Sequence, residues 1–315
     1  MKKTRGNRGE VTLRATRNQA VYTAIRGLPQ EHPDYPVRVL CELGGISRSA
    51  YYKWGSHVHT EKEDFNEMLA KKIEQLHGEH PDMGYRRIRD TLAHDQGIQV
   101  NDKRILRICR KKKIQSIIKH RYNCCTRPAV DPAHIAENIL NREFSAEHLN
   151  EKWVTDVTEF KYGTGTEERA GKVYLSVILD LCDHRPVSYA LSEHNDNPLV
   201  YDTFDAALAE NPGAQPIFHS DRGYQYTSKV FRQKILEAGM AQSMPRVAHC
   251  TDNGPMEGFW GIMKREMYYG KKYKTKDELL RAIEEYIDYY TNRRVQRKLD
   301  LLTPIEYHER LKSAA

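Results

Sequence analysis

The order of strand-like and helix-like segments after residue 150 restricts the folds open to this chain of 315 residues. Residues 152–162 (KWVTDVTEFKY) alternate in polarity and are rich in β-forming residues. Two more apolar runs follow, the first ending near Asp180 and the second beginning after Pro186. The pattern then gives, in order, a helix at 197–210, a strand at 215–221, a helix at 228–239, a strand at 241–244 and a helix from 254. Three strands followed by alternating helices and strands predict a mixed α/β sheet.

The segments before residue 150 are helical in pattern. Residues 36–54 contain two short helices around Gly44-Gly45, with Ser47 as a cap, which is a helix-turn-helix outline. An amphipathic helix at 61–77 and two more helices separated by Gly97 follow. We expect an N-terminal helical region, a second helix-turn-helix-like module, a linker with a short helical piece around His134 to Leu140, a catalytic core and a C-terminal helical extension. Their residues are 1–60, 61–121, 122–148, 149–270 and 271–315.

The distribution of charge separates these parts. Residues 1–130 hold 26 Lys and Arg against 14 Asp and Glu, whereas residues 131–315 hold 24 against 29. A basic front half favours a nucleic-acid contact, with an ordinary solvated surface as the alternative. The helix that begins at Asn101 or Asp102 carries the densest positive charge, at Lys103, Arg104, Arg107, Arg110, Lys111, Lys112 and Lys113. DNA phosphate is the usual partner of such a helix.

Cysteine usage and apolar runs exclude several classes of protein. The six cysteines have neither zinc spacing nor the pattern of a disulfide framework. They are Cys41, Cys109, Cys124, Cys125, Cys182 and Cys250. No apolar run is long enough to span a membrane and no signal peptide opens the chain. We therefore expect a cytoplasmic protein without a membrane partner, associated with the nucleoid when bound to DNA.

Three acidic residues fall where a sheet-based active site would need them. Asp156 lies within the first strand, and Asp221 follows the strand of PIFHSD, at the edge where open α/β sheets bind ligands. Glu257 lies one turn into a helix that Asp252 or Asn253 can cap. Its residues Met256, Phe259, Trp260, Met263 and Met267 form an apolar face. Taken alone, this segment favours the interpretation of Glu257 as a surface glutamate. Thirty-five residues, 222–256, separate the last two carboxylates.

These segments resemble a known family. WVTDVTEF, HSDRGYQYTS and SMPRVAHCTDNGPMEGFWGIMKRE are similar to the three acidic motifs of DDE transposases and retroviral-type integrases, and the thirty-five-residue gap is the family's spacing. The chain from about residue 36 resembles the OrfB product of insertion-sequence-three family transposons. That likeness implies a ribonuclease H-like five-stranded mixed sheet with flanking helices, preceded by all-α helix-turn-helix DNA-binding modules. Gly254 and Gly258 depart from the family pattern without affecting a carboxylate.

The resemblance also implies a chemistry. Asp156, Asp221 and Glu257 would be the catalytic residues and the ligands of two Mg²⁺ ions, which Mn²⁺ can replace. The reaction would be cleavage at transposon ends, followed by attack of the freed 3′-OH on target DNA. Lys264, seven positions after the glutamate, would reach a DNA phosphate. Supporting roles near the carboxylates are expected for Trp153, Thr158, His219, Ser220 and Trp260.

DNA contacts and partners complete the expectation. The candidate DNA-binding residues, besides Lys264, are Arg48, Tyr51, Arg86, Arg87, Lys103, Arg104, Arg107, Arg110 and Lys111. The partners would be transposon-end duplex DNA, target DNA, further copies of the chain in a homo-multimer on DNA, and the upstream OrfA product. The family's active enzyme is usually a fusion with that upstream frame, and this chain shows no sustained heptads.

Two other functions remain open from the residues. The chain can be a DNA-binding accessory or regulatory partner of a longer fusion transposase, without catalysis of its own. It can also be an enzyme of the ribonuclease H type, which shares the core but has no need of a basic helical front half. Metal-dependent cleavage of end DNA by this chain alone separates the first reading from the transposase. A preference for RNA–DNA hybrids would favour the second.

Overall fold

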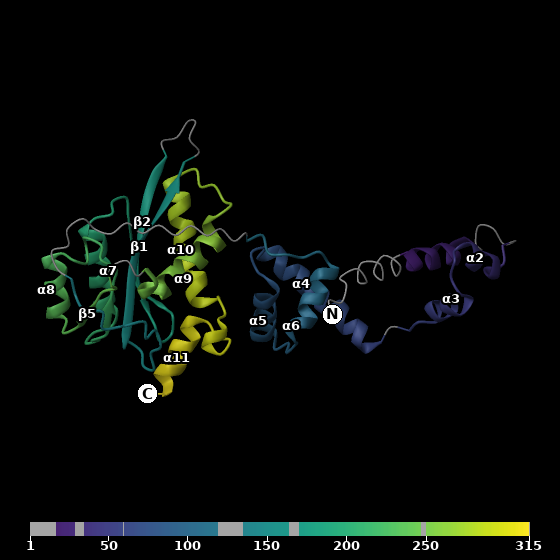
Figure 1. Cartoon of the computed structure of the whole chain (residues 1–315), viewed down its shortest axis with the longest axis horizontal. Helices are drawn as coiled ribbons and strands as arrows, with labels where there is room; N and C mark the ends of the chain where they lie inside the picture. Colours follow the sequence, from purple (N-terminus) through teal and green to yellow (C-terminus); the bar gives the residue numbers. More distant parts are fainter. Residues whose placement is uncertain are drawn as a thin grey trace, which may run out of the picture. The chain divides into compact units, whose positions relative to one another are not determined.

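The computed structural model describes residues 17–28, 35–58, 60–118, 135–163, 170–246 and 250–314. The chain divides into two compact units, residues 1–71 and residues 72–315, with the boundary inside helix α4 (Glu61–Glu79) (Figure 1). Much of the expected linker, including Cys124 and Cys125, lies outside the described residues.

The first unit contains the expected pair of short helices. The turn between α2 (Val37–Leu43) and α3 (Arg48–Gly55) passes through Gly45, whose φ of 63° favours glycine. Ser47 caps α3 as predicted, because its side chain accepts a hydrogen bond from a backbone amide of that helix. A small apolar core includes the buried residues Ile25, Leu40 and Cys41.

Two further helices lie at the start of the second unit. α5 (Tyr85–Gln96) ends at Gly97, whose φ of 64° is the left-handed conformation of a helix C-terminus. The side chain of Asn101 then caps α6 (Asp102–Lys111) by accepting a hydrogen bond from the Lys103 amide. Both boundaries confirm the prediction from sequence. Apolar residues bury one face of each helix, namely Ile88 and Leu92 on α5 and Ile105, Ile108 and Cys109 on α6.

A single mixed sheet forms the centre of the second unit. Its strands are β1 (Lys152–Tyr162), β2 (Gly171–Asp180), β3 (Pro186–Ser192), β4 (Ile217–His219) and β5 (Ala241–Ser243). They lie in the order β3-β2-β1-β4-β5. The first three strands pair antiparallel, whereas β4 is parallel to β1 and β5 is parallel to β4. This order and these directions confirm the expected ribonuclease H-like fold.

Helices cover both faces of the sheet. α7 (Asn197–Glu210) and α8 (Lys229–Glu237) pack on one face, where Trp153 is buried. α9 (Gly254–Met263) and α10 (Lys276–Asn292) pack on the other face, where Val154 is buried (Figure 1). Because strand side chains alternate between faces, Asp156 lies on the same face as Val154 and α9.

The chain around α9 differs from the prediction in two places. The described part of the expected helical piece, residues 135–140, is not helical, because its backbone bonds to the sheet edge instead. The Glu137 carbonyl accepts from the Met244 amide, and the Leu140 amide donates to the Ser243 hydroxyl at 3.0 Å. Asn253 occupies the N-cap position of α9, but its side chain makes no capping hydrogen bond. Its side-chain Nδ2 donates instead to the Thr155 carbonyl at 3.2 Å.

α9 does not end at Met263 but continues into a π-helical turn, η2 (Lys264–Tyr268), where the Tyr269 amide donates to the Lys264 carbonyl at 2.6 Å. The chain then runs through α10, a short 3-10 turn (Arg297–Leu299) and α11 (Pro304–Ala314). A continuous helical stretch therefore joins Glu257 to residues about three turns further on.

Candidate active site

Asp156 and Asp221 lie at matching positions beside neighbouring parallel strands. Val154 of β1 pairs with His219 of β4. Each aspartate follows its member of that pair by two residues, toward the carboxyl ends of the strands. The carboxylates are close enough for the charge of Asp221 to act on Asp156. The structure therefore brings together two of the three predicted acidic residues.

The carboxylate of Asp156 is held by two hydrogen bonds. The indole Nε1–H of Trp260 donates to Oδ2 at 2.9 Å, and the Val157 amide donates to Oδ1 at 2.8 Å. Burial, followed by the charge of Asp221, raises the pKa of Asp156 from 3.8 to about 7. Two half-buried carboxylates side by side repel each other. This repulsion favours either protonation of one carboxylate or binding of a cation between the two.

Asp221 is held by the tight loop that follows β4. The Gly223 amide donates to Asp221 Oδ1 at 2.8 Å, and a Cβ at position 223 would lie 2.9 Å from the same oxygen. Glycine therefore allows the loop to wrap this closely around the carboxylate. Burial raises the pKa of Asp221 above its ordinary value.

Tyr226 is a residue near the pair that the sequence did not single out. It is buried, and its hydroxyl lies 3.2 Å from the Thr155 hydroxyl. Burial, and then the charges of Asp221 and Asp156, raise the pKa of Tyr226 well above 10.0. Tyr226 lies five residues after Asp221 within the motif HSDRGYQYTS. This position is the signal by which the sequence could have identified Tyr226.

Glu257 lies on the exposed side of the first turn of α9. Partial desolvation raises the pKa of its carboxyl group. Among the described residues, no three His, Cys, Asp or Glu side chains are gathered closely enough to hold a metal ion as they stand. The third predicted ligand, Glu257, thus lies on α9, which covers this face of the sheet. Its carboxylate does not form a cluster with those of Asp156 and Asp221.

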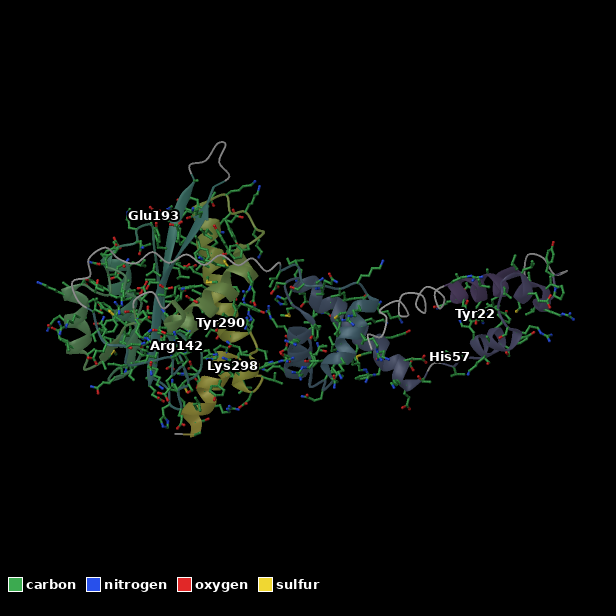
Figure 2. All side chains as sticks on the ribbon, viewed as in Figure 1. Tyr22, His57, Arg142, Glu193, Tyr290 and Lys298 are labelled. Atoms are coloured by element: carbon green, nitrogen blue, oxygen red, sulfur yellow. The ribbon has the colours of Figure 1, made fainter. Side chains whose placement is uncertain are left out.

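The apolar face of α9 fixes this helix on the sheet. Met256, Phe259 and Met263 are almost completely buried. The Phe259 ring packs edge-to-face on Tyr290 of α10 with a centroid distance of 4.9 Å (Tyr290 is labelled in Figure 2). The apolar face predicted from the sequence is therefore the face by which α9 packs on the sheet and on α10.

Lys264 lies at the start of the π-helical turn, on the same side of the sheet as Asp156. Its ammonium group is 5.4 Å from the centre of the Phe160 ring. Burial lowers the pKa of Lys264, although Asp156 and Glu159 oppose that shift. Its DNA contact stays a prediction.

The other residues that were expected to support the site are buried, although Trp153 lies on the opposite face of the sheet from Asp156. Trp153 donates its indole N–H to Asn150 Oδ1 at 3.1 Å, and Thr158 is buried further along β1. His219 pairs with the Ser243 hydroxyl at 2.9 Å, and burial lowers the pKa of His219 to about 4, so its ring is neutral at pH 7. The Ser220 hydroxyl donates to the Asp221 carbonyl at 3.1 Å.

Asp180 and Asp183 have structural partners. Asp180 accepts from the amides of Asn150 and Cys182, at 2.7 and 2.8 Å. Asp183 is fully buried and lies 2.6 Å from the His308 ring. These bonds close the β2–β3 turn and tie it to α11.

Asp252 has a role that the sequence did not predict. It was expected to cap α9, but it is fully buried and acts as an ion-pair hub. Arg142 Nε donates to Oδ1 at 2.5 Å, while Asn138 Nδ2 and the Arg246 amide each donate to Oδ2 at 3.1 Å (Arg142 is labelled in Figure 2). Arg246 Nε also donates to Oδ2 at 3.3 Å. Because Asn138 and Arg142 lie 114 and 110 residues from Asp252, periodicity could not reveal these contacts.

The basic residues of α6 face outward. Lys103, Arg107, Arg110 and Lys111 are exposed, and Arg104 is half-buried. A cavity of about 640 Å³ between the start of α5 and the end of α6 is lined in part by Tyr85, Arg110 and Lys113. The module therefore presents a basic surface with a concave part.

Three other candidate DNA contacts differ in their surroundings. Arg86 is exposed on α5, but the guanidinium of Arg87 is ion-paired inside the protein with Asp82 and Glu266. This placement argues against Arg87 as a DNA contact. In the first unit Arg48 is exposed at the start of α3, whereas the Tyr51 ring packs within 6.3 Å of Tyr22 and lies beside Trp54.

Comparison with known proteins adds the family. Residues 146–250 and 257–311 match the integrase core domain, and residues 64–122 match an HTH-like domain. InsK, a transposase for insertion sequence element IS150 from Escherichia coli K12, is 37% identical over 276 residues, covering 87% of this chain and 93% of its own length. A 31 kDa protein of insertion element IS600 from Shigella sonnei is 32% identical, covering 86% of this chain and 98% of that one.

The fold and the acidic edge of the sheet thus define a protein with an integrase core. The chain belongs to the family of insertion-sequence transposases. Among solved structures, the HTLV-2 integrase catalytic core domain in complex with magnesium is 18% identical, with a TM-score of 0.38, covering 51% of this chain and 97% of that chain. No helix in the described ranges is both long and apolar enough to cross a membrane.

Proposed function

We propose that this transposase catalyses metal-dependent cleavage at transposon ends and transfer of the resulting 3′-OH into target DNA. The observation that carries the proposal is the Asp156–Asp221 pair at the carboxyl ends of two parallel strands, on the sheet face covered by the helix of Glu257. A protein that only binds DNA has no physical reason to hold two like charges together in a half-buried site.

The donor set fits a hard divalent cation. Carboxylate oxygens are the ligands Mg²⁺ prefers, and the mutual repulsion of Asp156 and Asp221 would be relieved by positive charge. Asp156, Asp221 and Glu257 would hold two Mg²⁺ ions, or Mn²⁺ in their place. When bound, such ions neutralise charge at the phosphorus and at the oxygens that attack and leave.

The chain's own groups orient these ligands. The Trp260 indole and the Val157 amide fix both oxygens of Asp156, and the Gly223 amide fixes one oxygen of Asp221. Rotation of the exposed Glu257 side chain toward the pair would complete the set. Lys264, beside Asp156, would take the scissile strand's phosphate.

The helical module would hold the DNA. Lys103, Arg107, Arg110 and Lys111 form an exposed positive surface on α6, suited to the phosphates of a transposon end. Alanine at Arg104, Arg107 and Lys111 together should lower DNA affinity and reduce the slope of log K against log salt by roughly 3. An unchanged slope would remove the helix from the interface. A homo-multimer on DNA and the upstream OrfA product are the proposed protein partners.

A second function is favoured by one observation. The Glu257 carboxylate is not gathered with the aspartates in the described residues. The chain would then act as a DNA-binding partner of a longer fusion transposase and depend on that fusion for catalysis.

The test is an end-cleavage and strand-transfer assay on labelled duplexes with Mg²⁺ or Mn²⁺. Asp156→Asn, Asp221→Asn and Glu257→Gln should each abolish products while DNA binding persists. Glu159→Gln is the matched control, because Glu159 lies on β1 but pairs with Lys161 and Lys172 at the surface. Activity retained in one of the three would remove that residue from the ligand set. No products from the unmodified chain, with DNA bound, would favour the partner role.

A further inference from the structure

Glu266 is a buried carboxylate that no part of the proposed chemistry uses. It lies in the π-helical turn that continues α9, nine residues after Glu257, and its side chain is 6% exposed. Burial alone would raise the pKa of Glu266, but the charges and hydrogen bonds of Arg294 and Arg87 hold it below its ordinary value. The group is therefore an anion fixed by surrounding cations.

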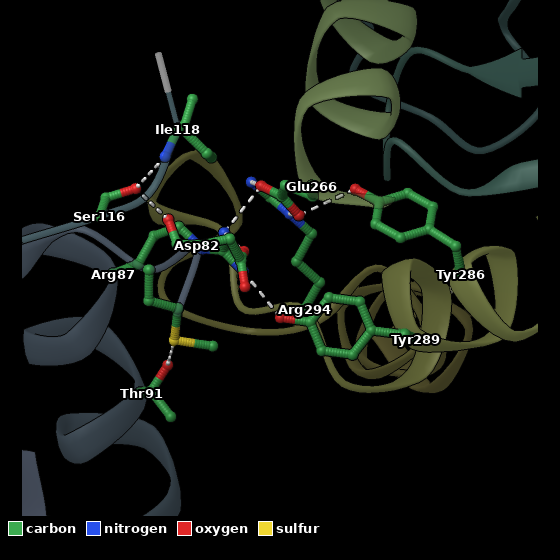
Figure 3. Close-up of polar contacts among 10 residues, drawn as sticks. Asp82, Arg87, Thr91, Ser116, Ile118, Glu266, Tyr286, Tyr289 and Arg294 are labelled. Carbon is green, nitrogen blue, oxygen red and sulfur yellow. Dashed lines mark hydrogen bonds and ion pairs between the residues drawn. The ribbon is translucent and has the colours of Figure 1, made fainter. Parts of the chain in front are cut away.

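Two arginines from different parts of the chain share this carboxylate (Figure 3). Arg294, which follows α10, donates from Nη2 to Oε1 at 2.8 Å and from Nε to Oε2 at 3.1 Å. Arg87, from α5 of the helix-turn-helix-like module, donates from Nη1 to Oε1 at 2.8 Å. The Tyr286 hydroxyl adds a bond to Oε2 at 2.9 Å.

Arg87 is itself fixed on both sides of the contact. Its Nη1 also donates to Asp82 Oδ2 within the module, at 2.7 Å, and its Nη2 donates to the Tyr289 hydroxyl of α10, also at 2.7 Å. Figure 3 shows the guanidinium between these partners. A planar group with several fixed partners transmits orientation better than a single flexible ion pair does.

The rest of this junction is also polar. Arg297 binds Asp90 at 2.6 Å and Asp102 at 3.1 Å, and the His94 ring lies 2.9 Å from Glu306. The module thus contacts the C-terminal segment through several charged groups, and Arg87 is one that reaches the helix of Glu257.

We propose that Arg87 is a positioning residue, which docks the DNA-binding module on the helical extension of α9 through Glu266 and thereby sets the placement of Glu257. This inference rests on the proposed catalytic role of Glu257. It predicts that the module and the active site are coupled, so that a change at Arg87 alters turnover on bound DNA more than it alters DNA affinity.

The experiment compares Arg87→Met with Arg89→Met. Both arginines lie on α5 with side chains 21% exposed, but Arg89 pairs with Asp90 and Asp102, which Arg297 also binds, and among the described residues none of these ion pairs includes Glu266. Amide hydrogen exchange of residues 254–268 is measured first, because it does not depend on catalysis. We expect faster exchange there in Arg87→Met and in Glu266→Gln, and no change in Arg89→Met.

Turnover at saturating end DNA is measured next. Arg87→Met should lower it about tenfold while the Kd for DNA changes less, Arg87→Lys should restore part of it, and the effects of Arg87→Met and Glu266→Gln should combine less than additively, although Glu266→Gln also weakens the Arg294 pair. Unchanged exchange in residues 254–268, or equal effects of Arg87→Met and Arg89→Met, would overturn the proposal. Altered exchange together with an active Glu257→Gln would instead support the docking and refute the proposed role of Glu257.

Discussion

Replacing Asp252 by Asn should destabilise the core strongly and in a pH-dependent way. The carboxylate is fully buried. It accepts hydrogen bonds from Asn138 and Arg142, and from both the backbone amide and the side-chain Nε of Arg246. An asparagine presents an NH₂ group where one carboxylate oxygen was, so either Arg142 or the groups on the other oxygen lose their acceptor.

The magnitude follows from the exposure of the partners. Breaking a buried ion pair by removing one charge costs about 3–5 kcal/mol. The Arg142 and Arg246 side chains are 44% and 52% exposed, so water replaces part of what they lose. We therefore expect a smaller loss, about 2–3 kcal/mol in the free energy of unfolding. The melting temperature should fall by about 4–12 °C.

The sign of the pH dependence is fixed by the direction of the pKa shift. Burial opposes ionisation, but the hydrogen bonds from Arg246 and Arg142 dominate and hold the pKa of Asp252 far below 3.8. Its contribution to stability is therefore complete above about pH 4 and is lost as the pH falls below that value. The gap in stability between the unmodified chain and Asp252→Asn should stay constant from pH 8 to about pH 5 and narrow below pH 4.

The assay is urea unfolding between pH 8 and pH 3.5, followed by intrinsic fluorescence. Asp205→Asn is the control, because Asp205 makes a surface pair with Lys234 and is 53% exposed, so its loss should cost less than about 1 kcal/mol. Equal destabilisation by the two substitutions at pH 7, or a gap for Asp252 that persists unchanged at pH 3.5, would refute the reasoning.

Other substitutions test the acidic site itself. Trp260→Phe keeps the packing of α9 but removes the N–H bonded to Asp156, so Mn²⁺ affinity measured by calorimetry should fall about tenfold. Gly223→Ala places a Cβ against Asp221 Oδ1 and should lower strand transfer more than tenfold without changing the melting temperature; full activity would show that the loop need not stay closed. Lys264→Met should slow end cleavage while Lys264→Arg largely preserves it, in a single-turnover assay. Because the pKa of Asp156 is raised to about 7, ionisation weakens the folded state as the pH rises, so the increase in melting temperature on adding Mn²⁺ should be larger at pH 8 than at pH 6.

Local patterns in the sequence were sufficient for most of the fold. The alternation in KWVTDVTEFKY predicted β1, and Ser47, Gly97 and Asn101 predicted helix boundaries, because each depends on residues near in sequence. The piece at 135–140 was predicted wrongly as helical, since its backbone bonds to a strand about a hundred residues away. A local pattern does not contain such a contact.

The candidate site was likewise predictable from the sequence only in part. Spacing and resemblance selected Asp156 and Asp221, and the parallel register of β1 and β4 brings them together. The bond from Trp260 to Asp156 depends on how α9 lies across the sheet, so the sequence could predict packing for Trp260 but not this contact. Arg87 was predicted to bind DNA because it lies in a basic segment, yet its partner is 179 residues further along the chain.

The helix formed by α9 and its π-helical turn lies beside two acidic sites with opposite electrostatics. At the Asp156–Asp221 pair, burial and then the charge of Asp221 raise the pKa of Asp156, so the site gains from a cation that binds from outside. At Glu266, two arginines already supply the positive charge and the pKa is lowered, so the site is closed to further cations. The first arrangement suits reversible metal binding and the second suits permanent docking. If Arg87 docks the helix-turn-helix-like module as proposed, this one helix would couple the position of the module to the geometry of the carboxylates.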